Sequence, residues 1–165
     1  MKTTSVLIAL LLPAMMFAQS KGFDKVPVAT AEECKSAEPK VLEAANYLID
    51  HPLDCKDKNC EYGRKLIIEW QTNTPDYSFQ IDVKIVDLSK GNDMLLGVVM
   101  ACMTKYALEN PADAKDALKM KVGSFNLIAD YAAKSTNGVK ATKQIKKLLE
   151  AKKKGKMQEF AEEEK

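Results

Sequence analysis

The sequence predicts an all-α protein, a single antiparallel bundle or array of five to six helices. Apolar residues recur every three to four positions in most segments, which is the spacing of one helix face. Residues that start or stop helices stand between these segments, so the connections are short. Only residues 78–86 alternate as a strand does, and a lone strand has no partner to pair with. An α+β fold, with residues 78–86 as a strand, is the alternative.

The first residues of the chain have the pattern of an export signal. Lys2 supplies a positive charge, an apolar run at 6–12 follows, and Ala18 is a small residue of the kind that precedes a cleavage site. The apolar run is too short to span a bilayer as a helix. We therefore expect residues 1–18 to be a signal peptide, cleaved near Ala18 and Gln19, and the mature protein to be periplasmic or secreted.

The rest of the chain divides into three parts by composition. An extended leader is expected at 19–29, where a glycine and a proline occur, and a helical domain follows at 30–150. The last part, 151–165, is expected to be a charged tail that continues the final helix. A domain of this size is long enough to bury a substantial hydrophobic core.

Two helices are expected in the first half of the domain. Thr30 and Glu33 have the spacing of a capping box, which predicts a first helix over 30–50 that ends at a histidine–proline pair. Pro39 either kinks this helix or lies in its first turn. A second helix is predicted over about 62–73, where apolar residues again share one face.

Residues 77–88 fit two descriptions. Every second residue from Phe79 to Ile85 is apolar, as in a half-buried strand, and the β-branched content favours that reading. Apolar residues also recur every four positions from Tyr77 to Ile85, as on a helix. Because the chain contains no second strand candidate, we expect a loop that runs into a short helix.

Three more helices complete the domain. A helix over 93–109 is apolar around most of its circumference, so we expect it to be buried on several sides and central. Asn110 and Pro111 have the pattern of an N-cap and a first helical residue, which predicts a helix from there to about residue 135. A last amphipathic helix is predicted to start near Val139 and to run into the charged tail.

The cysteines predict one disulfide and leave a second one open. Exported proteins keep cysteines as disulfides by default, and Cys55 and Cys60 flank a small loop between two predicted helices. In a straight first helix, Cys34 would lie roughly 24 Å from the helix end, at about 1.5 Å per residue, so it is poorly placed to meet either of them. Cys34 and Cys102 either form a second disulfide or stay free, since a buried free cysteine is ordinary.

The last predicted helix carries a candidate contact for polyanions. The lysines that could make this contact are Lys143, Lys146, Lys147, Lys153 and Lys154. A basic amphipathic helix favours anionic lipid or polysaccharide, but the acidic residues that follow neutralise part of this charge. We therefore expect peripheral membrane contact at most. The formal net charge of the whole chain is only +2, which argues against a nucleic-acid partner.

No catalytic or cofactor motif stands out. The Gly-x-Ser-x-Gly elbow, the His-Glu-x-x-His pair, the phosphate loop and the dinucleotide fingerprint are all missing from the sequence, and His51 is the one histidine. We therefore expect no cofactor, no metal and no enzymatic activity. Trp70, Tyr77 and Phe79 are either an aromatic anchor of the core, which is the more common role, or a possible ligand groove, because aromatic side chains dominate recognition surfaces.

Two parts of the chain resemble a known group of proteins. The Phe17-Ala18-Gln19 end of the signal resembles those common in Bacteroidota. The run Trp70…Thr74-Pro75-Asp76-Tyr77-Ser78-Phe79, followed by Gly91-Asn92 and Leu95-Leu96-Gly97, is similar to small exported helical proteins of that phylum that lack an assigned function. The resemblance implies export and a helical fold, and it transfers no catalytic residue.

Three functional hypotheses follow from the sequence. The leading one is a non-catalytic binding or interaction module of the cell envelope, whose partner is an envelope protein or a small ligand. The second is an envelope-surface protein that contacts anionic lipid or polysaccharide through its lysine-rich helix. The third is a small thiol-dependent or hydrolytic enzyme, which would have to use a cysteine or His51.

Overall fold

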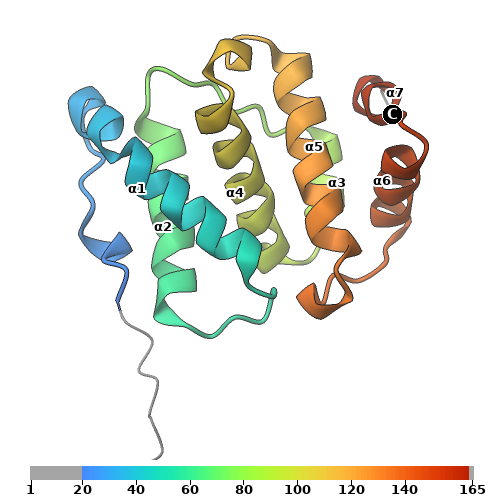
Figure 1. Cartoon of the computed structure of the whole chain (residues 1–165), viewed down its shortest axis with the longest axis horizontal. Helices are drawn as coiled ribbons and strands as arrows, with labels where there is room; N and C mark the ends of the chain where they lie inside the picture. Colours follow the sequence, from blue (N-terminus) through green and yellow to red (C-terminus); the bar gives the residue numbers. More distant parts are fainter. Residues whose placement is uncertain (1–19, 164–165) are drawn as a thin grey trace, which may run out of the picture.

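Seven α-helices and three short 3-10 helices form the part of the chain that this computed structural model describes, residues 20–163 (Figure 1). They are α1 (Ala31–Asp50), α2 (Lys58–Asn73), α3 (Val83–Ser89), α4 (Asp93–Glu109), α5 (Ala117–Ala133), α6 (Lys143–Lys153) and α7 (Met157–Glu162), with η1 (Phe23–Lys25), η2 (Pro111–Asp113) and η3 (Ser135–Asn137). These residues contain no strand, so the all-α prediction is confirmed and the α+β alternative is wrong. The predicted signal peptide lies outside the described residues.

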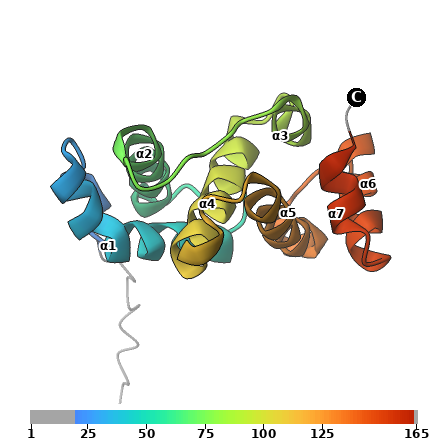
Figure 2. The same cartoon turned by 90° about the horizontal axis from the view of Figure 1, so that it is seen from above.

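The helices form an array in which α4 is central. It contacts α1, α2, α3 and α5, and α5 in turn contacts α6 and α7 (Figure 1). Figure 2 shows α2 and α3 on one side of the layer formed by α1, α4 and α5, joined by a segment that crosses above α4. The prediction that the helix over 93–109 is buried on several sides is therefore confirmed.

Two clusters of buried side chains meet at α4 within the described residues. One lies between η1, α1 and α2 and includes Met100 and Ala101 of α4. The other lies between α3, α5, α6 and α7 and includes Val99 and Met103 of α4. Phe79 of the segment between α2 and α3 packs against both clusters. Burial of these apolar side chains is the main source of the fold's stability.

Helix α1 begins where the capping box predicts. The Thr30 hydroxyl accepts from the Glu33 N–H at 3.2 Å, and a Glu33 carboxylate oxygen accepts from the Thr30 N–H at 3.0 Å. Pro39 lies inside the helix. Helix α2 begins at Lys58, earlier than predicted, because the Asp57 carboxylate accepts the Asn59 N–H at 2.8 Å and so acts as its N-cap.

Three predicted boundaries need correction. The part of the predicted leader that the structure describes, residues 20–29, is not simply extended, since it contains η1 and buries Phe23 against α1 and α2. The pair Asn110-Pro111 opens only η2, while Asp116 caps the long helix α5. The tail does not continue α6, because Gly155 has a φ of 67° and turns the chain. Helix α7 follows it, and its apolar residues pack in the same cluster as α5.

Candidate functional site

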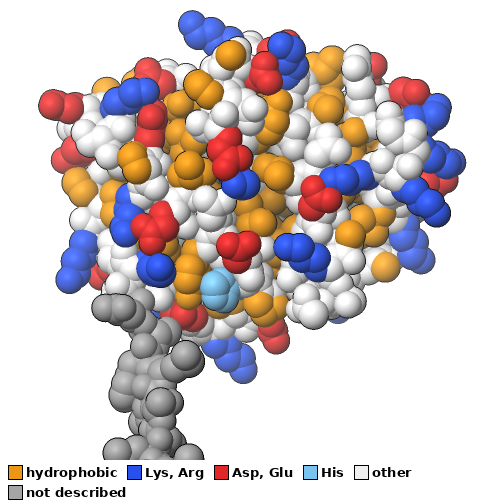
Figure 3. Space-filling model, viewed as in Figure 1, with side chains coloured by type: hydrophobic (Ala, Val, Ile, Leu, Met, Phe, Trp, Pro, Cys, Tyr) orange, Lys and Arg blue, Asp and Glu red, His pale blue; other side chains and the backbone are white. Residues whose placement is uncertain are grey.

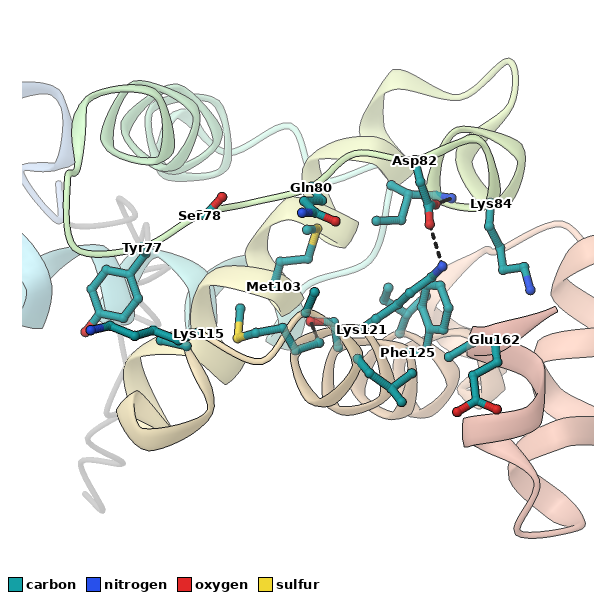
Figure 4. A pocket seen from close by; sticks show the side chains of 18 of the residues that line it. Tyr77, Ser78, Gln80, Asp82, Lys84, Met103, Lys115, Lys121, Phe125 and Glu162 are labelled. Atoms are coloured by element: carbon teal, nitrogen blue, oxygen red, sulfur yellow. Dashed lines mark hydrogen bonds and ion pairs between the residues drawn. The ribbon is translucent and has the colours of Figure 1, made fainter. Parts of the chain in front are cut away.

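A groove of about 960 Å³ lies beside residues 75–82, which we name the crossing segment because they cross from α2 to α3 (Figure 4). The crossing segment and the start of α3 form one wall, and α5 and the end of α7 form the other. Apolar side chains of α3, α4 and α5 form the floor: Ile85, Met103, Leu118, Met120, Phe125 and Ile128. This volume is at the upper end of the range of about 300–1,000 Å³ that is usual for ligand sites.

The crossing segment is held at both ends and extended between them. Pro75 cannot continue helix α2 and favours an extended conformation in the residue before it. At the other end, the Asp82 carboxylate accepts the Ile85 N–H at 3.0 Å and so caps α3. The prediction of a loop that runs into a short helix is therefore confirmed.

The three aromatic residues considered as a core anchor or as a possible ligand groove form a packed cluster. Trp70 is fully buried, and its indole Nε1 donates to the backbone oxygen of Cys34 at 2.9 Å. The rings of Tyr77 and Phe79 lie with their centroids 5.4 Å and 5.8 Å from that of Trp70. Of the three, Tyr77 also lines the groove, whereas Trp70 and Phe79 do not. The prediction therefore selected the correct segment, but Trp70 and Phe79 belong to the core.

An ion pair joins the two walls of the groove. The Lys121 ammonium of α5 lies 2.5 Å from the Asp82 carboxylate of the crossing segment (Figure 4). Burial alone would raise the pKa of Asp82, but the bonds from Lys121 and from the Ile85 N–H outweigh it and hold the pKa below its usual value. Asp82 is therefore ionised at neutral pH, and the pair links the two walls of the groove at this point.

Lys84 is the third charged residue of interest at this end of the groove. Its ammonium donates to the backbone oxygen of Phe160 in α7 and lies 4.6 Å from the centroid of the Phe160 ring. It forms no ion pair with any carboxylate of residues 20–163. Burial, and next the nearby Lys121 ammonium, lower the pKa of Lys84, while Glu163 and Asp82 act in the opposite direction.

Sequence reasoning did not single out Asp82, Lys84 or Lys121. The local signal for Asp82 was present, since an aspartate just before an apolar run is a helix-start residue. Lys121 comes from a helix far along the chain, and only the packing of α5 brings it to Asp82. No pattern in the sequence pairs these residues.

The disulfide between Cys55 and Cys60 is present as predicted, with its sulfur atoms 2.04 Å apart. It closes the turn between α1 and α2. Beside it, the Tyr47 hydroxyl of α1 donates to the Asp57 carboxylate at 2.6 Å, which ties the same turn to α1. This end of the molecule is therefore held by a covalent bond and a hydrogen bond.

The possible second disulfide is wrong, because Cys34 and Cys102 are both free and buried. They belong to different core clusters on opposite sides of α4. Burial raises the pKa of both thiols, so both stay protonated at neutral pH. Neither thiol therefore lends support to a thiol-dependent enzyme.

The predicted polyanion contacts all lie on the exposed side of α6 or at its end: Lys143, Lys146, Lys147, Lys153 and Lys154. Figure 3 shows lysine and arginine side chains gathered at the edge of the molecule over α6 and α7, with acidic side chains among them. Lys154 lies 2.6 Å from Glu150, while the other four form no ion pair within the described part of the chain. The apolar side of α6 is buried in the core and is not free to enter a bilayer.

Three further findings concern metal binding, membrane spans and similarity to known proteins. Among residues 20–163, no group of three or more histidine, cysteine or acidic side chains is arranged to hold a metal ion. None of the helices formed by these residues combines the length and the hydropathy that crossing a bilayer requires. No protein-family model, curated protein or solved structure matches the chain, so the groove is interpreted from its own geometry.

Proposed function

We propose that this protein is a non-catalytic binding module that holds its ligand in the groove beside the crossing segment. The observation that carries the proposal is the groove itself, a concave surface with an apolar floor and a polar rim. Sites of this kind bind ligands that bury apolar groups on the floor and are oriented by a few polar side chains. Asp82, Lys84 and Lys121 supply the polar groups at one end.

We also propose that the protein works in the cell envelope or outside the cell. A disulfide persists in an oxidising compartment, and the Cys55–Cys60 bond is compatible with that location. The charged and apolar pattern of residues 1–18 also favours export from the cytoplasm. An envelope protein or a small envelope molecule is then the expected partner.

Two exposed valines of α3 provide a matched test of the groove. Val83 is 65% exposed and lines the groove, whereas Val86 is 50% exposed and does not. We expect the uncharged dye Nile red to bind the native protein with enhanced fluorescence. Val83→Glu should weaken that binding about tenfold, because a buried valine contact is worth about 1.5 kcal/mol, and Val86→Glu should leave it unchanged. Failure of the dye to bind, or equal losses in both variants, would contradict the proposal.

A second candidate function is contact with anionic lipid or polysaccharide through the outer side of α6. The lysines that carry it are those without an ion pair in the described residues: Lys143, Lys146, Lys147 and Lys153. Because the apolar side of α6 is buried, such contact would be electrostatic and peripheral. We expect sedimentation with phosphatidylglycerol vesicles at low salt, loss of it near 0.5 M salt, roughly, and none with phosphatidylcholine vesicles. Co-sedimentation that is insensitive to salt would count against this candidate.

A further inference from the structure

The backbone of the crossing segment has hydrogen-bonding groups that form no bond within the described part of the chain. From Tyr77 to Ile81 the chain is extended, and none of its N–H or C=O groups makes a hydrogen bond within residues 20–163. The bonds resume on either side, where the Thr74 N–H donates to the Trp70 oxygen at 2.9 Å and the Val86 N–H to the Asp82 oxygen at 3.1 Å. An extended run with unused donors and acceptors resembles the edge of a sheet, which readily pairs with another chain.

The sequence of this run has the character of a strand as well. Its apolar residues alternate, with Tyr77 and Phe79 packed inward and Ser78 and Gln80 exposed. The inward side chains fix the segment on the core. Among residues 20–163 there is no second strand of the kind that normally accompanies this pattern.

The unused backbone groups discriminate between classes of ligand. An acyl chain lying along the crossing segment would separate these N–H and C=O groups from water and offer no partner in return. An extended peptide would satisfy them by main-chain hydrogen bonds and would also place alternate side chains on the apolar floor. A run from Tyr77 to Ile81 matches roughly five peptide residues, or about 16 Å at strand spacing.

The charges of the groove fit a peptide with one carboxylate better than a polyanion. Three lysines and four acidic residues line the groove, so the overall charge is nearly balanced. Lys121 is already paired with Asp82, whereas Lys84 forms no ion pair with a carboxylate of the described residues, although Glu162 at the end of α7 and Glu163 after it line the same end. A ligand carboxylate beside Lys84 would therefore meet an ammonium that can still donate hydrogen bonds.

We propose that the groove binds an extended peptide segment that adds as a strand along residues 77–81 and directs a carboxylate to Lys84. This inference rests on the proposed function, because it names the ligand of the same groove. The carboxylate is either the peptide's C-terminus or an acidic side chain.

The test uses defined peptides. N-acetylated heptapeptides with apolar residues at alternate positions would be arrayed as free acids and as C-terminal amides, and the affinities of those that bind would be measured by fluorescence anisotropy. Alternate residues of a strand direct their backbone N–H groups to opposite edges. N-methylation of the peptide at one parity of positions, either the odd or the even ones, should therefore lower its affinity for the protein at least about tenfold. N-methylation at the other parity should have little effect. Equal effects at both parities would overturn strand addition.

Protein variants test the two contacts separately. Gln80→Pro and Ile81→Pro each remove one N–H, on opposite edges of the segment, and neither N–H is used inside the described chain. We expect one of the two proline variants to lose peptide binding while it keeps Nile red binding and the helical circular dichroism signal. The matched alanine variants, Gln80→Ala and Ile81→Ala, should keep peptide binding, Nile red binding and the helical signal, because they retain the backbone N–H. Loss in neither proline variant would overturn the inference.

Lys84→Gln tests the carboxylate contact. It should weaken binding of the carboxylate-bearing peptide about tenfold and leave the matched neutral peptide unchanged. The neutral peptide is the C-terminal amide if the C-terminus is recognised, and a Glu→Gln peptide if a side chain is recognised. An equal effect on charged and neutral peptides would remove Lys84 from the proposal.

The outcomes separate this inference from the proposed function. If Nile red and sodium dodecanoate compete for the groove while no arrayed peptide binds, the groove is a ligand site and the peptide inference fails. If dye, dodecanoate and peptides all fail to bind, both proposals fail.

Discussion

Removal of the Cys55–Cys60 disulfide should lower the free energy of unfolding by about 2 kcal/mol. The two cysteines are separated by 5 positions in the sequence, so the bond closes a very short loop. Chain entropy gives about 3 kcal/mol for a 15-residue loop and correspondingly about 2 kcal/mol for this one. In a domain of this size, each kcal/mol changes the melting temperature by roughly 2–4 °C, so a fall of about 4–8 °C is expected.

The variant should be Cys55→Ala with Cys60→Ala. Cys60 is fully buried, and alanine avoids burying the unpaired hydroxyl that serine would introduce. Thermal and urea unfolding followed by circular dichroism give the change in stability. Reduction of the native protein should produce a similar loss, since both treatments open the same loop.

A reductant added to the double variant is the decisive control. Because Cys34 and Cys102 are free, the reductant should leave the melting temperature of the variant unchanged. Alkylation in urea should likewise count two thiols in the native protein before reduction and four after it. A further loss of stability on reduction of the variant would mean that Cys34 and Cys102 are bonded, and the reasoning would be refuted.

Three more predictions concern the stability of the array. Gly123→Ala should cost about 1–3 kcal/mol in urea unfolding, because the added Cβ would overlap the Tyr106 ring, whereas Gly97→Ala meets only a flexible side chain and should be nearly neutral. Burial raises the pKa of Tyr131 from 10.0 to about 12, so the stability that its neutral phenol contributes is complete below pH 10 and is lost as the pH rises through about 12. Unfolding measured from pH 9 to 12, roughly, should show this decline in the native protein and a smaller one in Tyr131→Phe. Thr30→Ala removes a capping bond and should lower the free energy of unfolding by about 1 kcal/mol in the same urea assay.

Local side-chain caps made much of the helix pattern predictable. The capping box of Thr30 and Glu33 placed the start of α1, and the strongly apolar run over 93–109 identified α4 and its central position. The prediction failed where two caps lie close together. Asn110 has the local signal, but the Tyr106 hydroxyl donates to the Asp113 carboxylate at 2.8 Å, and this bond accompanies a separate 3-10 turn before α5.

The prediction for residues 151–165 was wrong for a different reason. Charge dominated the prediction that the tail continues α6, whereas Met157 and Phe160 decide the structure by burial. Gly155 takes the left-handed conformation that lets the chain turn, and α7 then covers part of the core. Burial of a few apolar residues therefore stabilises the fold of this segment more than the charges around them do, because exposed charges contribute little to stability.

The crossing segment explains why the candidate site was only partly predictable. Its alternation predicted a strand and its spacing predicted a helix, and the structure contains an extended run followed by α3 because Asp82 caps the helix at the boundary. The alternation still has a physical meaning, since it packs Tyr77 and Phe79 inward and leaves an unpaired edge beside the groove. The opposite wall comes from α5 and α7, and its lysine reaches Asp82 only through tertiary packing. No strand within residues 20–163 pairs with this edge, which is why the alternation alone did not predict a sheet, and this same unpaired edge is the reason we propose that a peptide binds there.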